Sequence, residues 1–361
     1  MEINVDRMPW WAWVWPAAGW AILVATFFAG NSGVVAAAAG AALICTVFAA
    51  VYHAELVAHR TGEPFGTLVL ALAVTIIEVA LIVSVMISAP AEKAGLARDT
   101  VFAAIMIVMN GIVGVCLLWG GVRHHEQGFQ VQGASAALAV LAALTTLTLV
   151  VPNVVASEAG PTFTTPQLIF AGTVSLILFC SFIFVQTVRH RDYFLPPSDG
   201  DEDAHAPPPS NRMAVTSLVL LVVALVAVVG LAKYLTPTVE FGIDTMGMPK
   251  AVVGIVIAAV VLLPECLAAL KAAKANRLQN SLNLALGSIL AAIGLTIPAV
   301  ALVSIWLGQP LALGLDDSDR TLLVLTLIVS VITLGTGRTT VLQGIVHLMI
   351  FAAFLFFAAF P

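Results

Sequence analysis

Charged residues are scarce in this chain. Only 10% of its 361 residues are Asp, Glu, Lys or Arg, whereas 60% are hydrophobic. A soluble domain of average composition is about 25% charged. A soluble fold has too small an interior to bury this much apolar surface, so the sequence predicts an all-α polytopic membrane protein.

Several sequence motifs are missing from the chain, and each missing motif argues against one class of function. The chain has no basic cluster, so a nucleic-acid partner is not expected. The stretch from Tyr52 to Arg60 contains two histidines but does not form HExxH, and no span carries a nucleophile or metal motif. The sequence therefore indicates neither an enzyme nor a bound cofactor. The N-terminus lacks a basic region followed by a cleavage site, so we expect no signal peptide.

Cysteine is also rare. The four cysteines lie far apart in apolar segments and form no CxxC pair: Cys45, Cys116, Cys180 and Cys266. This spacing predicts neither a zinc site nor a disulfide framework, and small buried side chains are the expected role.

Long apolar runs dominate what is present. A helix needs about 20 apolar residues to cross a bilayer. On that rule the sequence predicts eleven transmembrane helices, at 10–29, 33–52, 65–88, 99–121, 133–152, 165–188, 213–235, 249–271, 279–306, 319–336 and 339–360. Four tryptophans between Trp10 and Trp15 are typical of an interfacial belt at the start of the first span.

One segment differs from the rest. Residues 189–212 are rich in Pro and acidic side chains, which predicts a flexible linker. The linker divides the chain into two halves, and the sequence predicts four segments in all. These are an extra N-terminal helix (1–32), a first five-helix repeat (33–188), the acidic linker (189–212) and a second five-helix repeat (213–361). Because five is odd, the two repeats have opposite orientations in the membrane, as in many secondary transporters.

The distribution of Lys and Arg predicts the orientation. The N-terminal side carries ten of them: Arg7, Arg60, Arg123, Arg189, Arg191, Arg212, Lys271, Lys274, Arg277 and Arg338. The opposite side carries five: Lys93, Arg98, Lys233, Lys250 and Arg320. The positive-inside rule then places the N-terminus and the linker in the cytoplasm and the C-terminus outside.

Each repeat carries one glutamate in the middle of an apolar run. Glu78 lies in the second span of the first repeat and Glu265 in the second span of the second repeat. A carboxylate at mid-membrane costs at least ~2.5–3.5 kcal/mol, and such residues are functional by default. A purely structural pair, each hydrogen-bonded to a neighbouring helix, is the alternative interpretation.

The spans that follow the two glutamates share a pattern of small residues. In each span, spacings of 4, 4 and 3 residues place four residues on one helical face, and the second set follows the first at an offset of 180 positions. The first set is Ala103, Ile107, Gly111 and Gly114, and the second is Asn283, Gly287, Ala291 and Gly294. Small residues let helices pack closely. Amides and hydroxyls accompany them at Thr75, Ser84, Asn110, Asn280, Asn283, Ser288 and Thr296.

These oxygen-bearing groups suit a hard cation such as Ca²⁺. Burial disfavours the charged form of a carboxylate, whereas a divalent cation favours it. Two buried glutamates can therefore hold either a cation or protons, and this competition predicts an antiporter with alternating access. A cation channel or uniporter on the same scaffold is the alternative. A transporter of organic solutes is disfavoured because the polar residues of the spans are acidic and small.

Two motifs carry a family resemblance. The run from Gly62 to Glu78, and the run from Leu263 to Cys266 followed by Asn280 to Ser288, resemble the calcium/proton antiporters of the cation exchanger family. The resemblance covers the chain from about residue 50 onward. It implies eleven spans, with one extra helix before two inverted repeats, and exchange of cytoplasmic Ca²⁺ for external protons.

The resemblance also implies site residues. Glu78 and Glu265 correspond to the ion-binding and proton-coupling glutamates of the family, and Gly287, Ser288 and Asn110 correspond to further motif positions. The chain departs from the family where Val74-Thr75 and Val261-Leu262 replace a Gly-Asn pair before each glutamate. Related members also move Na⁺ or K⁺. The resemblance implies the inner membrane of a bacterium, inorganic cations as partners, and either a single copy or a homo-oligomer.

Overall fold

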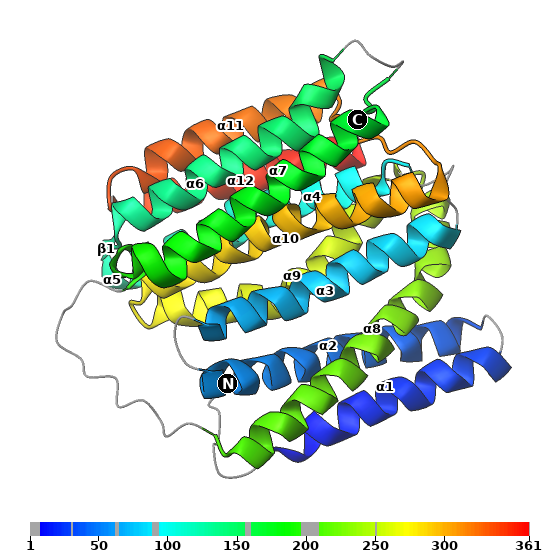
Figure 1. Ribbon diagram of the computed structural model, residues 1–361. Helices are drawn as coiled ribbons and strands as arrows, with labels where there is room; N and C mark the ends of the chain where they lie inside the picture. Colours follow the sequence, from blue (N-terminus) through cyan, green and yellow to red (C-terminus); the bar gives the residue numbers. More distant parts are fainter. Residues whose placement is uncertain are drawn as a thin grey trace. The chain divides into compact units, whose positions relative to one another are not determined.

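The computed structural model describes residues 8–29, 32–61, 65–88, 94–155, 160–195, 209–249 and 251–360 (Figure 1). These residues form eleven helical rods. They are α1 (Trp10–Ala29), α2 (Gly33–Thr61), α3 (Phe65–Ser88), α4–η1–α5 (Leu96–Met106, Ile107–Ile112, Val113–His124), α6–η2–η3 (Val131–Thr145, Thr146–Val150, Val151–Asn153), α7–η4 (Thr165–Phe184, Val185–Arg189), α8 (Asn211–Thr245), α9 (Ala251–Lys274), α10 (Leu278–Leu307), α11 (Asp317–Leu334) and α12 (Val341–Ala359). A short 3₁₀ turn, η5 (Arg191–Phe194), follows η4.

The rods confirm the predicted all-α membrane fold. Nine of them, within the described ranges, are long and apolar enough to cross a bilayer. Helices suit these apolar runs because the lipid interior offers no hydrogen-bond partner to a backbone group. Two rods end well beyond their predicted boundaries, since α2 extends to Thr61 and α8 to Thr245. Three rods contain π-helical turns, at η1, η2 and η4, which the sequence pattern did not predict.

Some predicted features lie outside the described residues. These are the central part of the acidic linker (196–208) and three side chains of the orientation count, Arg7, Lys93 and Lys250.

The chain divides into two compact units, and each contains helices from both sides of the linker. Unit 1 comprises Met1–Leu81 and Asp199–Gly247. In it α2 packs along both α1 and α8. Polar contacts join these helices: Nε2 of the buried His53 lies 3.0 Å from the Ala12 carbonyl, and the exposed Trp20 indole donates to the Val223 carbonyl at 3.0 Å.

Unit 2 comprises Ile82–Ser198 and Met248–Pro361. Its packing repeats between the two halves of the chain. The α5 helix packs along α12, and α10 packs along α7 (Figure 1). Both α7 and α12 begin with a capping box, at Thr164 and Thr340, in which a glutamine at the third helical position returns the hydrogen bond.

Backbone pairing at the two ends of unit 2 shows the inversion. At one end, β1 (Gln127–Gly128), after α5, pairs antiparallel with β2 (Arg338–Thr339), before α12. At the other end, Thr162, before α7, forms a single bridge with Ala312, after α10. The first pairing joins the loop after α5 to the loop before α12, and the second joins the loop after α10 to the loop before α7. The equivalent loops thus meet at opposite ends, as two inverted repeats require.

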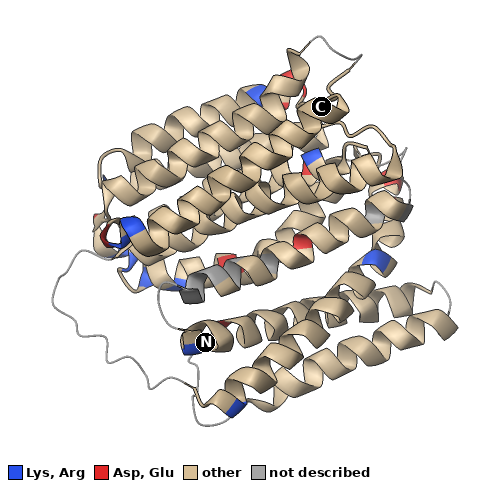
Figure 2. Ribbon diagram, viewed as in Figure 1, with Lys and Arg blue, Asp and Glu red and all other residues tan. Residues whose placement is uncertain are grey.

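The two ends of unit 2 also differ in charge (Figure 2). Among its described residues, the β1–β2 end carries Arg123, Arg189, Arg191, Lys271, Lys274, Arg277 and Arg338, with the acids Glu126 and Asp192. The opposite end carries Arg98 and Arg320, with Asp99, Asp316, Asp317 and Asp319. Unit 2 is therefore basic at one end and acidic at the other.

Candidate functional site

Glu265 and Ser288 meet in the interior of unit 2. Glu265 lies on α9 and Ser288 on α10, and both side chains are buried. The Ser288 hydroxyl donates a hydrogen bond to Oε2 of Glu265. The other carboxylate oxygen, Oε1, is buried and has no hydrogen-bond partner among the described residues. The carboxylate is thus held on one side and open to a further ligand on the other.

Pro264, the residue before Glu265, changes the backbone hydrogen bonding of α9. Helix α9 continues through Pro264 without a break. A proline has no N–H, so the carbonyl of Val260, four residues earlier, loses its helical donor. On α10, a Cβ built at Gly287 would meet no atom within 4 Å, so there is open space next to Ser288. Carboxylate and carbonyl oxygens are the ligands that hard cations prefer.

Glu78 and Thr75 lie on α3, three residues apart, and both side chains are buried. Residues at this spacing face the same side of a helix. Glu78 lies near the middle of a 24-residue helix, which places it far from both helix ends. The prediction of a buried mid-helix carboxylate in each half of the chain is therefore confirmed.

Asn110 and Gly111 lie in the π-helical turn η1. The Asn110 side chain is fully buried, and its contacts are with residues that the sequence pattern did not single out as a site. Its Nδ2 donates to the Thr326 hydroxyl at 2.8 Å, and its Oδ1 lies 3.1 Å from Nδ1 of His347. Nε2 of His347 in turn lies 3.2 Å from the Thr333 hydroxyl.

The remaining predicted amides lie near the basic end of unit 2. Asn280 is exposed on the first turn of α10. Asn283 is half-buried, where it donates to the Phe194 carbonyl at 2.5 Å and accepts from Gln279 at 2.8 Å. The bond to Phe194 connects α10 to η5, a short turn within the first part of the acidic linker. The structure therefore brings Glu265 and Ser288 together, and it places Asn283 in a separate hydrogen-bond network.

The small-residue stripes pack against neighbouring helices at most positions. A Cβ on Gly114 would lie 3.1 Å from Cβ of His347 on α12, and one on Gly294 would lie 2.6 Å from Cβ of Phe179 on α7. Gly111 faces the Phe351 ring, also on α12. Close packing thus explains these three glycines, whereas Gly287 borders open space.

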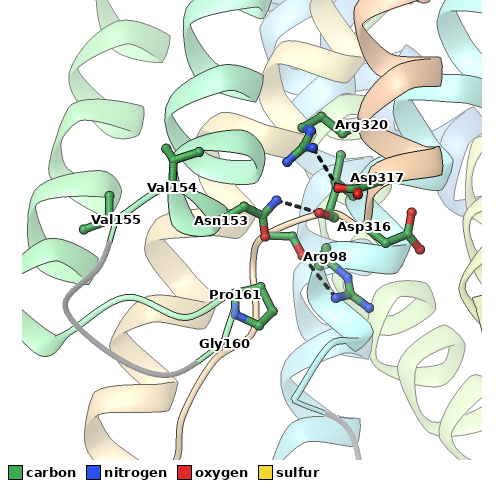
Figure 3. A pocket seen from close by; sticks show the side chains of 11 residues that line it. Arg98, Asn153, Val154, Val155, Gly160, Pro161, Asp316, Asp317 and Arg320 are labelled. Atoms are coloured by element: carbon green, nitrogen blue, oxygen red, sulfur yellow. Dashed lines mark hydrogen bonds and ion pairs between the residues drawn. The ribbon is translucent and has the colours of Figure 1, made fainter.

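A hollow lies at the acidic end of unit 2 (Figure 3). It has a volume of about 740 Å³ and is lined by Arg98, Asn153, Val154, Val155, Gly160, Pro161, Gly314, Leu315, Asp316, Asp317 and Arg320. Its polar groups are engaged with one another. Arg98 donates to the Gly314 carbonyl at 3.2 Å, Asn153 donates to the Leu315 carbonyl at 2.5 Å, and Arg320 pairs with Asp317 at 2.7 Å. The first two contacts join α4 and η3 to the loop before α11, and the third lies within the first turn of α11.

The acidic turn at the start of α11, which carries Asp316, Asp317 and Asp319, has a structural role. Asp316 caps α11, because its Oδ1 accepts from the Asp319 backbone N–H at 2.8 Å. Across the described part of the chain, no three His, Cys, Asp or Glu side chains are grouped so as to hold a metal ion.

Comparison with known proteins agrees with this architecture. Residues 31–188 and 216–360 match the family described as sodium/calcium exchanger protein. The protein y4hA of Sinorhizobium fredii is 50% identical over 369 residues, covering 100% of this chain and 99% of that protein. The sodium-potassium/proton antiporter ChaA of Escherichia coli is 35% identical over 316 residues, covering 87% and 85%.

Solved structures show the same fold. The native structure of YfkE superposes with a TM-score of 0.72 at 16% identity, covering 97% of this chain and 100% of that one. The crystal structure of the H⁺/Ca²⁺ exchanger CAX gives 0.71 at 13% identity, covering 96% and 87%.

Proposed function

We propose a function for this chain on the basis of its family. The chain belongs to the sodium/calcium exchanger protein family, whose members transport cations by exchange. The chain is a secondary antiporter that exports Ca²⁺, with Na⁺ or K⁺ as further cargo, in exchange for protons. The cation and the protons compete for the carboxylates of Glu78 and Glu265, and alternating access exposes these groups to each side of the membrane in turn. The cation is cargo and not a resident cofactor.

The state of the Glu265 carboxylate is the observation that supports this proposal most directly. Ser288 occupies one of its oxygens, and the other is buried without a hydrogen-bond partner among the residues that the structure describes. A buried carboxylate left in this way either carries a proton or takes a cation, because an isolated buried charge is strongly disfavoured. Glu78 supports the same proposal from the other repeat, since it too is a buried carboxylate in the middle of a helix.

The charge difference between the ends of unit 2 supports a direction for transport. The basic end, with β1 and β2, faces the cytoplasm by the positive-inside rule, and the acidic end faces outward. In a bacterial inner membrane the proton gradient is then directed from the acidic end toward the basic end. Cation export coupled to proton entry uses that gradient.

The test is proton movement in everted membrane vesicles after addition of Ca²⁺, Na⁺ or K⁺. Vesicles with the parent protein are compared with vesicles carrying Glu78→Gln, Glu265→Gln or Glu126→Gln. Glu126 is a matched control, because it is a carboxylate in a loop, exposed and paired with Arg338 at 3.3 Å. We expect cation-driven proton release from the parent and from the Glu126 variant, and loss of it in the other two.

Two outcomes contradict the proposal. Normal proton release by Glu78→Gln or Glu265→Gln, at equal protein levels, eliminates that carboxylate as a coupling group. Cation flux without any proton movement in the parent indicates a channel or uniporter instead.

A further inference from the structure

We propose that His347 is a positioning residue for cation exchange, and that it acts by orienting the Asn110 amide within the π-helical turn η1. This inference rests on the proposed function, because His347 lies outside the proposed exchange site and acts on that same site.

The geometry is a chain of buried polar groups on three elements. Nδ1 of His347 on α12 lies 3.1 Å from Oδ1 of Asn110 on η1, and the Asn110 Nδ2 donates to Thr326 on α11 at 2.8 Å. At the other side of the ring, Nε2 lies 3.2 Å from the hydroxyl of Thr333, also on α11. The side chains of His347, Asn110 and Thr326 are fully buried.

One arrangement of protons satisfies the whole chain with a neutral ring. Asn110 Oδ1 can only accept, so Nδ1 of His347 carries the hydrogen and donates it. Nε2 is then an acceptor, and the Thr333 hydroxyl donates to it. The Thr326 hydroxyl accepts from Asn110 and is 3.5 Å from the Met106 sulfur, to which it can donate. A fully satisfied buried network fixes the orientation of each member.

The Asn110 turn connects this network to the exchange site. The six-residue π-helical turn η1 (Ile107–Ile112) packs against α11 and α12 on the network side. The same turn also packs against α9 and α10, the helices that carry Glu265 and Ser288. A π-helical turn is an irregular segment that needs specific contacts to hold its shape, and such turns are frequent at functional sites. The network therefore fixes the turn against which the Glu265 and Ser288 helices pack.

Helix packing alone does not require this network. The position equivalent to Asn110 in the second repeat, 180 residues later, is Leu290, which is buried on α10. The chain therefore fills the equivalent position with an apolar side chain in one repeat and with a hydrogen-bonded amide in the other. The polar version occurs where the rod is π-helical, in η1, whereas α10 is α-helical throughout.

Two amide substitutions separate positioning from packing. In His347→Asn the new amide nitrogen takes the place of Nδ1, so the bond to Asn110 is kept and the bond to Thr333 is lost. In His347→Gln the longer amide reaches the place of Nε2, so the bond to Thr333 is kept and the bond to Asn110 is lost. Each variant loses one of these two side-chain hydrogen bonds, and a structural role predicts similar effects of both.

The measurement is the half-saturating Ca²⁺ concentration, obtained in two ways. The first is proton movement in everted vesicles, which also gives the maximal rate. The second is the Ca²⁺-dependent rise in unfolding temperature of the purified protein, because a ligand that binds the folded state stabilises it. We expect His347→Gln to raise the half-saturating concentration about tenfold, as loss of a supporting partner of an ion site does. We expect His347→Asn to stay close to the parent.

The outcomes are distinct. Equal half-saturating concentrations in both variants and the parent, with only protein yield or maximal rate reduced, overturn the inference and leave the exchange function intact. A separation of the two variants in the unfolding titration, without proton movement in the parent, supports positioning and rejects proton exchange. A parent that neither moves protons nor is stabilised by Ca²⁺, Na⁺ or K⁺ overturns both.

Discussion

Ser288 donates its hydroxyl to the Glu265 carboxylate, although the two residues are 23 positions apart and lie on different helices. The bond connects α9 to α10 at the residue that we propose exchanges a cation for protons. A hydroxyl donor stabilises the ionised form of a carboxylate. Ser288 therefore favours the state that binds a cation over the state that holds a proton.

Replacement of Ser288 should shift this balance. In Ser288→Ala the ionised form of Glu265 loses a charge-assisted hydrogen bond, which is a cost of about 1.5 kcal/mol or about tenfold in an equilibrium constant. Protons then compete better with the cation. We expect a higher half-saturating Ca²⁺ concentration at neutral pH, and half-maximal transport at a higher pH than in the parent, measured as proton movement in vesicles across a pH series.

Ser304→Ala provides the matched control for this experiment. Ser304 lies on the same helix and donates to the Gln309 carbonyl at 2.6 Å, near the helix end. The Ser304→Ala substitution removes a hydroxyl that does not contact a carboxylate, so the pH dependence of transport should stay that of the parent. An unchanged pH profile in Ser288→Ala would show that the Glu265 bond does not set the competition.

The glycines of α10 should differ in their tolerance of a methyl group. A Cβ at Gly294 lies 2.6 Å from Cβ of Phe179, closer than real Cβ contacts come, whereas one at Gly287 meets nothing within 4 Å. Overpacking of this kind costs about 1–3 kcal/mol. We expect Gly294→Ala to lower the unfolding temperature in detergent and Gly287→Ala to leave it unchanged. Equal unfolding temperatures would contradict the packing of α10 on α7.

The charge difference between the ends of unit 2 predicts an orientation that labelling can check. Single cysteines are introduced at Glu126 and at Asp317, in a chain whose four native cysteines are replaced by alanine. Both positions are exposed, at the basic and the acidic end respectively. We expect a membrane-impermeant thiol reagent to label the Asp317→Cys variant in intact cells, and the Glu126→Cys variant only in everted vesicles. The reverse pattern would place the basic end outside.

The repeated features were predictable from the sequence because they occur twice. Glu78 and Glu265 each interrupt an apolar run, and the cost of a carboxylate in lipid makes both conspicuous. The network around Asn110 could not be predicted in this way. Its position has no polar counterpart at Leu290, and its partners Thr326 and His347 lie more than 200 residues away in the chain. A lone histidine or threonine in an apolar span is compatible with many packings.

The number of helices was predictable from the sequence because a bilayer sets the length of an apolar run, and Glu78 and Glu265 were conspicuous because a carboxylate in lipid is costly. Which polar groups meet depended on how the helices pack. Ser288 reaches Glu265, whereas Asn283, one and a half turns earlier on the same helix, reaches the Phe194 carbonyl. The physical reason is that helix period assigns a residue to a face, but the packing partner of that face depends on contacts distant in the sequence.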